Sequence, residues 1–169
     1  MNIFAVSADP ADCARALDDR RLIKMVLETA QLLSAAVRAR PDLQPGADPA
    51  LFYRATHLNH PVALWVRQQP ANFAWTKRLL DELLDEYSHR YGRVHACARI
   101  AAALGETGSH APPVDWCNCT PFPELPTFDA YRATLAAKWA ADSRPPSWRD
   151  RGPPAWFGGR TPEHPIPMV

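Results

Sequence analysis

The sequence predicts an all-α protein: a compact single-domain bundle of four to five helices with long Pro-rich loops and an irregular C-terminal tail. Two observations predict this class. Apolar residues recur at helical spacing over several long stretches, and no stretch reads as a convincing pair of strands. Since 169 residues are typical of a single domain, we expect one domain over 1–169, with a Pro-, Arg- and Trp-rich tail at 143–169 that packs on it or binds substrate.

The longest helical stretch covers 18–40, DDRRLIKMVLETAQLLSAAVRAR. On a helical wheel its polar side chains share one arc about 100° wide, and mostly apolar side chains fill the remainder. The polar arc consists of Arg20, Arg21, Lys24, Glu28, Gln31 and Arg38. So apolar a helix is expected to be largely buried, and the polar arc is then either its one exposed face or the floor of a polar cleft.

Capping and breaking residues place the other helices. Asp9 caps a short first helix, and Pro41 ends the long one. Gly92 ends a later helix as its C′ residue, and Thr127 is expected to cap the last one. In chain order, the helical segments are expected at 10–17, 18–40, 61–69, 73–91, 94–104 and 127–142, with loops at 41–56 and 105–126.

Two charged residues interrupt the apolar face of the 73–91 helix. Glu86 lies on the edge of the apolar arc and Arg90 lies inside it, and their i,i+4 spacing allows them to pair. Because desolvating a charged pair costs free energy, this pair is expected to be either a structural bridge or part of a functional site.

The net charge of +1 is unevenly distributed. Segments 13–40 and 132–169 each carry six basic and three acidic side chains, whereas 101–131 carries four acidic and no basic ones. Two positive segments permit a basic face for nucleic acid. The longest apolar runs fall far below the ~20 residues that span a bilayer, and the start of the chain lacks a basic leader. We therefore expect a cytoplasmic protein with no membrane partner.

Two polar groups are candidates for catalysis. Lys24 and Glu28 lie one turn apart. Positive neighbours favour the neutral, nucleophilic form of an amine, and a carboxylate beside that amine can transfer protons. The alternative is an ordinary exposed ion pair. His57, Asn59 and His60 precede a helix, where they can contact phosphate, transfer protons or ligate a metal, or simply cap the helix.

The tail interleaves arginines with aromatic rings, including Trp148 and Arg149. Cations for phosphates and aromatic faces for unstacked bases are the components of single-strand or flipped-base recognition. Alternatively, the tail wraps the bundle and buries its tryptophans.

Five motifs resemble those of a family of small phage and bacterial proteins, the pyrimidine-dimer DNA glycosylases of the phage endonuclease V type. The motifs are MNIF, DDRRLIKMVLETAQLLS, THLNHP, EYSHRYGRVH and PPAWF. The likeness covers most of 1–104 and the C-terminal end, and it is closer to the uncharacterised members than to the well-understood phage enzyme.

The resemblance implies a compact all-α DNA-repair enzyme. The family enzyme attacks the deoxyribose C1′ with its N-terminal α-amine, forms a Schiff base with the help of an early glutamate, and cleaves the strand by β-elimination. In this chain Arg21 aligns with that glutamate. Glu28, Asp18 or Asp19 is therefore expected to replace the glutamate, and Lys24 or the Met1 amine is expected to be the nucleophile.

The leading hypothesis is thus a DNA-directed base-excision enzyme that needs no cofactor and no resident metal. The expected catalytic residues are Lys24, Glu28, His57 and His60. The expected substrate-binding residues are Arg20, Arg21, Asn59, Arg90, His95, Trp148 and Arg149. One rival is a metal-dependent hydrolase of a nucleotide or another small phosphorylated substrate, built on the two expected catalytic histidines. The other is a non-enzymatic DNA- or protein-binding module.

Overall fold

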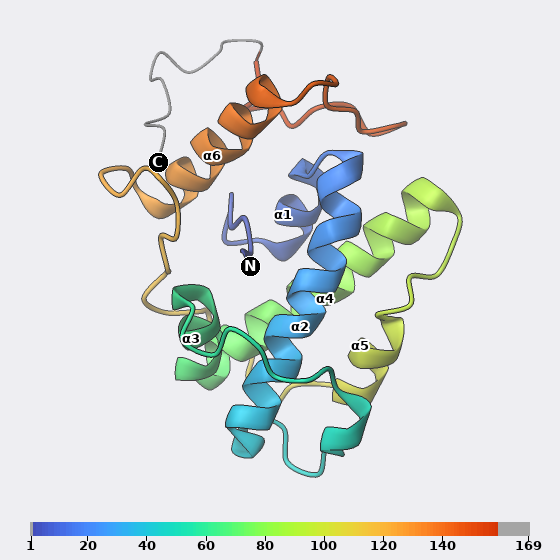
Figure 1. Cartoon of the computed structure of the whole chain (residues 1–169), viewed down its shortest axis with the longest axis vertical. Helices are drawn as coiled ribbons and strands as arrows, with labels where there is room; N and C mark the ends of the chain where they lie inside the picture. Colours follow the sequence, from blue (N-terminus) through green and yellow to red (C-terminus); the bar gives the residue numbers. More distant parts are fainter. Residues whose placement is uncertain (1, 159–169) are drawn as a thin grey trace.

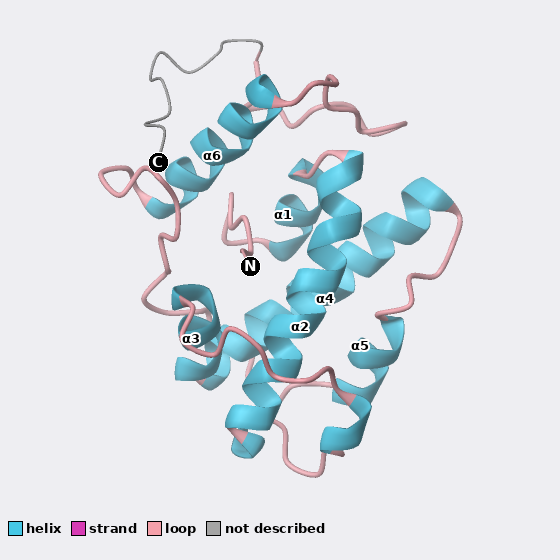
Figure 2. Cartoon of the chain, in the orientation of Figure 1, coloured by secondary structure: helices cyan, strands magenta, loops and turns pink. Residues whose placement is uncertain are grey.

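The structure, a computed structural model, describes residues 2–158, so the tail predicted at 143–169 is described only as far as 158. This described part consists of helices and loops without a strand, which confirms the predicted class (Figure 2). The α-helices are α1 (Pro10–Ala16), α2 (Asp19–Ala39), α3 (Pro61–Gln68), α4 (Pro70–Tyr91), α5 (Ala98–Leu104) and α6 (Thr127–Ala141). Short 3₁₀ turns occupy Pro41–Leu43 and Pro49–Leu51. Within residues 2–158, every helix is too short or too polar to cross a membrane.

The centre of the molecule is the crossing of α2 over α4 (Figure 1). Most apolar positions of α2 are buried as the wheel predicts, with Leu22, Val26 and Leu33 fully enclosed. Ile23 and Leu27 are exceptions, because both are exposed. Helix α1 packs against α4, α3 packs against both long helices, and α5 does so at their lower end. Helix α6 lies across the N-terminal segment from α2. The exposed arc of α2 therefore faces a space bordered by α6 and the start of the chain.

Helix ends follow the predicted capping rules at most positions. The Asp9 carboxylate accepts the backbone N–H of Ala11 at 2.9 Å, and Gly92 ends α4 in the left-handed region at φ 60°. The prediction that Thr127 caps the last helix is wrong: Pro126 occupies the N-cap, and Thr127 is already the first helical residue. The Pro126 ring fixes φ at this position but carries no acceptor, so this helix starts without a side-chain cap bond.

The number and extent of the helices also differ in detail from the prediction. The described residues contain six α-helices, one at each of the six expected segments, whereas the predicted bundle had four to five. Helices α3 and α4 are separate, as expected, and join at Gln69. The helix expected at 94–104 begins only at Ala98. Before it, the chain turns, and the His95 imidazole accepts the backbone N–H of Cys97 at 3.1 Å. This local hydrogen bond competes with the backbone hydrogen bonds that a helix would form at the first residues of the expected 94–104 segment.

The Glu86–Arg90 pair forms as the spacing predicts and serves as a structural bridge. Arg90 donates to the Glu86 carboxylate at 2.7 Å, and both side chains are almost fully buried. The same guanidinium donates to the Leu17 carbonyl at 2.8 Å and to the Asp19 carboxylate at 3.2 Å. These bonds fasten the end of α4 to the junction between α1 and α2. The junction in turn fixes where the exposed arc of α2 points.

Candidate active site

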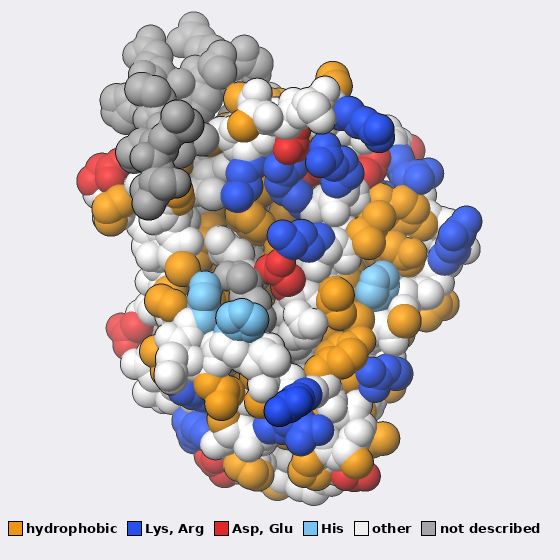
Figure 3. All heavy atoms as spheres, in the orientation of Figure 1, with side chains coloured by type: hydrophobic (Ala, Val, Ile, Leu, Met, Phe, Trp, Pro, Cys, Tyr) orange, Lys and Arg blue, Asp and Glu red, His pale blue; other side chains and the backbone are white. Residues whose placement is uncertain are grey.

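A cavity of about 420 Å³ lies where the first turns of α2 meet the N-terminal segment and α6. Its charged lining consists of Arg20, Arg21, Lys24, Glu28 and Lys138. Its remaining lining comes from Asn2, Phe4 and Met25. Figure 3 shows Lys and Arg side chains gathered where α6 faces the first turns of α2. The cavity is thus predominantly cationic, with one carboxylate among its lining residues.

Glu28 contacts the start of the chain. Its Oε2 atom accepts a hydrogen bond from the backbone N–H of Asn2 at 3.0 Å, and its side chain is only 16% exposed. Its Oε1 atom lies 3.4 Å from the Lys24 ammonium, whose side chain is 71% exposed. A largely buried carboxylate therefore lies within reach of both the nitrogen of residue 2 and a lysine amine.

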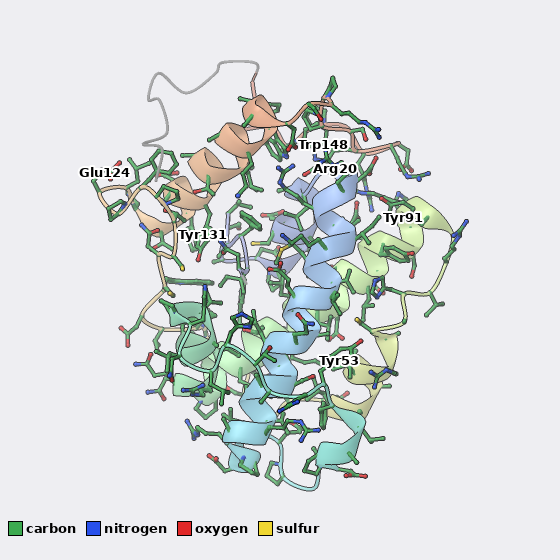
Figure 4. The ribbon with its side chains drawn as sticks, in the orientation of Figure 1. Arg20, Tyr53, Tyr91, Glu124, Tyr131 and Trp148 are labelled. Carbon is green, nitrogen blue, oxygen red and sulfur yellow. The ribbon has the colours of Figure 1, made fainter. Side chains whose placement is uncertain are left out.

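The start of the chain is held in place by local bonds. The Asn2 side-chain carbonyl accepts the backbone N–H groups of Ile3 at 2.8 Å and Phe4 at 3.3 Å, which closes a tight turn. Phe4 sits in the left-handed region at φ 43° and packs edge-on against Tyr131 of α6 at 6.3 Å between ring centroids. Figure 4 shows Tyr131 on the side of α6 that faces the N-terminal segment. The position of the Asn2 nitrogen is therefore fixed by packing against α6 as well as by Glu28.

The two other carboxylates considered for the acid role have structural partners. Asp18 is buried and accepts from Arg21 at 3.0 Å and from the Trp139 indole at 2.9 Å. Asp19 accepts from Arg90 at 3.2 Å and from the Ser147 hydroxyl at 2.7 Å. Of the three candidates, Glu28 is the one that lines the cavity.

Arg21 joins two parts of the protein. Besides Asp18, it donates to the Asp142 carboxylate at the end of α6 at 2.8 Å. That hydrogen bond lowers the pKa of Asp142 below its usual range. For Arg21, burial opposes the charge, but the two carboxylates outweigh it and raise its pKa. The positive charge of Arg21 is therefore compensated locally, and its main effect is to fasten α6 to α2.

His60 is not among the residues that line this cavity. Its Nδ1 atom accepts the backbone N–H of Val62 at 3.3 Å, so the ring caps α3 and the second nitrogen carries the proton of the neutral form. Burial lowers the pKa of His60 below 6.5, the positive charge of His57 adds to this effect, and the charge of Glu28 opposes it. His60 therefore lies within electrostatic range of Glu28. His57 and Asn59 are exposed in the turn before α3, and His57 has a positive φ of 52°.

Other residues expected at the site lie elsewhere. Arg90 is enclosed in the bridge described above. His95 lines a different cavity, together with Asp81 and Asp85, and its ring meets the face of Tyr87 at 4.9 Å. Six of the expected site residues therefore do not share one pocket, because only the first two of them line the cavity beside α6: Lys24, Glu28, His57, His60, Arg90 and His95.

The two tail residues expected to bind substrate, Trp148 and Arg149, lie in different environments. Trp148 is buried and donates its indole N–H to the Ala16 carbonyl at 3.0 Å, so it anchors the tail (Figure 4). Arg149 is exposed and lies over the ring of Tyr91 at 4.3 Å, on the side of α2 bordered by α4.

Two polar residues of the cavity, Asn2 and Lys138, were missed by sequence reasoning, as were the apolar lining residues Phe4 and Met25. Asn2 belongs to the MNIF motif, and that motif was the signal for its importance. Lys138 carries no sequence signal, because a single lysine on a helix surface is ordinary. Its place depends on how α6 docks.

Within residues 2–158, no three His, Cys, Asp or Glu side chains are grouped so that they could hold a metal ion. The rival metal-dependent hydrolase, built on His57 and His60, therefore finds no preformed ligand set in this part of the chain.

Neither the curated proteins nor the solved structures contain a significant match to the chain. A family model described as pyrimidine dimer DNA glycosylase matches residues 1–99, which is more than half of the 169 residues and includes α1 to α4. The matched segment holds Asn2, Lys24, Glu28 and His60. The chain therefore belongs to the pyrimidine dimer DNA glycosylase family.

Proposed function

We propose that the protein excises a damaged base from DNA and then cleaves the strand, with an amine as nucleophile and Glu28 as the group that transfers protons. The observation that supports this proposal is the 3.0 Å hydrogen bond from the Asn2 nitrogen to the Glu28 carboxylate. The α-amine expected as the nucleophile belongs to Met1, the residue bonded to this nitrogen, and it is this nitrogen itself if Met1 is removed. Phosphates of the substrate would meet the cationic lining of the same cavity.

The N-terminal α-amine is a better candidate nucleophile than Lys24. An α-amine ordinarily titrates near 7.7–8.0 and a lysine amine near 10.4, so at neutral pH the α-amine is neutral, and hence nucleophilic, in a far larger fraction of molecules. The Lys24 amine is also largely exposed and hydrated. Lys24 is therefore assigned to substrate binding and to the electrostatic environment of Glu28.

The reaction proceeds by attack of the neutral amine on the deoxyribose C1′. The C1′–N glycosidic bond breaks, and the departing base takes the bonding electron pair and a proton. Loss of the second amine proton and opening of the sugar give the imine. Removal of a C2′ proton then expels the 3′ phosphate by β-elimination, and water finally releases the amine. Glu28 is positioned to accept and return these protons, a role that typically contributes about 10²–10⁴ in rate.

Borohydride trapping on DNA with an abasic site tests the proposal, because reduction converts the imine into a stable covalent adduct. We expect an adduct with the natural protein, and peptide mass spectrometry should place it on the α-amine of the N-terminal residue. Glu28→Gln should lower the rate of adduct formation by at least about 100-fold. Glu82→Gln is the matched control, since Glu82 lines a different cavity.

Three results would contradict the proposal. The first is the absence of any adduct together with no binding to DNA at low salt. The second is an adduct that maps to Lys24, which would reassign the nucleophile. The third is a Glu28→Gln protein that loses stability without losing a measured activity, which would favour a non-enzymatic binding module.

A further inference from the structure

Helix α6 lies outside the segment that matches the family, yet its last turn forms one wall of the cavity. Two hydrogen bonds fix this turn against the start of α2: the Trp139 indole donates to Asp18 at 2.9 Å, and Arg21 donates to Asp142 at 2.8 Å. Lys138 immediately precedes Trp139. Its backbone is therefore held at the cavity mouth by bonds that do not involve its own side chain.

The cations around the cavity are not equivalent. The charge of Arg21 is offset by Asp18 and Asp142, and Lys24 lies near Glu28. Arg20 is more available, because its side chain is 58% exposed and its distance to the nearest Asp142 oxygen is 3.7 Å.

Lys138 is also exposed. Among the salt bridges of residues 2–158, none involves its amine, and Asp142 lies only within longer electrostatic range of it. Two cations, Arg20 from α2 and Lys138 from α6, thus line the same cavity with charge available for a ligand.

We propose that Arg20 and Lys138 form a phosphodiester-binding site that holds the DNA backbone next to the sugar that reaches Glu28. The planar guanidinium of Arg20 suits two phosphate oxygens, and the lysine ammonium acts as a point charge. Because the two cations come from different helices, the backbone phosphate is held between α2 and α6. This inference rests on the proposed function and adds a positioning residue from the part of the chain outside the family match.

The proposal is tested by comparing Lys138→Ala, Lys138→Arg and the natural protein in binding to an abasic-site duplex. The control is Arg15→Ala, which removes one exposed positive charge from residues that line other cavities. We expect Lys138→Ala to weaken binding by about tenfold, in line with the loss of one charge-assisted hydrogen bond. The plot of log affinity against log salt concentration should become shallower by about 0.9, the loss of one phosphate contact. Lys138→Arg should restore most of both quantities.

Turnover gives a second readout. The loss in Lys138→Ala should fall on KM more than on kcat, because the residue binds the backbone and does not touch the reacting atoms. An unchanged salt slope, or an equal loss in Arg15→Ala, would overturn the proposal. Failure of the proposed function can be distinguished from failure of this inference. If no covalent adduct forms, the salt dependence of binding to an undamaged duplex still measures whether Lys138 contacts a phosphate.

Discussion

Replacing Arg90 with methionine should strongly destabilise the protein without affecting DNA binding by the folded form. The guanidinium is fully buried and donates to Glu86 and Asp19 and to the carbonyl oxygens of Leu17 and Arg15. Methionine fills much of the same volume but donates no hydrogen bond. Buried acceptors at the junction of α1, α2 and α4 would therefore lose their donor.

The expected loss in unfolding free energy is about 4 kcal/mol. Removing one partner of a buried ion pair typically costs about 3–5 kcal/mol, and a buried carbonyl left without a donor costs about 1–3 kcal/mol. Arg151 reduces the total, because it still donates to Glu86 at 3.0 Å when Arg90 is absent. For a chain of this size, 1 kcal/mol lowers Tm by roughly 2–4 °C, so Tm should fall by roughly 10 °C.

Urea unfolding followed by circular dichroism measures this loss. The matched control is Arg151→Met, which touches the same carboxylate from an exposed position and should cost much less unfolding free energy than Arg90→Met. DNA affinity of the Arg90→Met variant, measured well below its Tm, should equal that of the natural protein. A loss in unfolding free energy below about 1 kcal/mol, or folded protein that no longer binds DNA, would refute the assignment of Arg90 to structure.

Two further predictions concern pH. Burial alone would raise the pKa of Glu86, but hydrogen bonds from Arg151 and Arg90 outweigh burial and lower this pKa. The ionised Glu86 carboxylate therefore stabilises the fold fully above its ordinary pKa of 4.5, and this stabilisation is lost as pH falls through the lower pKa of the folded state. In Glu86→Gln, the acid branch of the stability–pH curve should therefore be shallower in urea titrations, and an unchanged branch would contradict this. His60, whose pKa is lowered, should add a titration step below pH 6.5 to the acid side of kcat/KM, separate from the deprotonation of the attacking amine. This step should disappear in His60→Asn, which can still cap α3 but does not titrate; a step that persists would exclude His60 from proton transfer.

The sequence by itself determined the helical class and most helix ends. The wheel of α2 separated its buried and exposed sides correctly for most residues, because a 3.6-residue period links spacing directly to direction. Asp9 and Gly92 marked helix ends through local backbone chemistry that needs no tertiary partner. The i,i+4 spacing of Glu86 and Arg90 likewise predicted a contact within one helix. The prediction that Thr127 caps the last helix was wrong, because the proline before it can supply the conformation that a capping side chain otherwise stabilises.

Only the tertiary structure decided which polar residues share a cavity. The pairing of Glu28 with the Asn2 nitrogen joins positions 26 residues apart, and Lys138 reaches the same cavity from the last helix. No periodicity encodes such contacts, because they depend on how α6 and the N-terminal segment dock on α2. The same docking encloses Arg90 in a bridge and carries His95 to another cavity. The spacing of residues determines the direction in which each side chain of a helix points, whereas packing between helices determines which side chains meet.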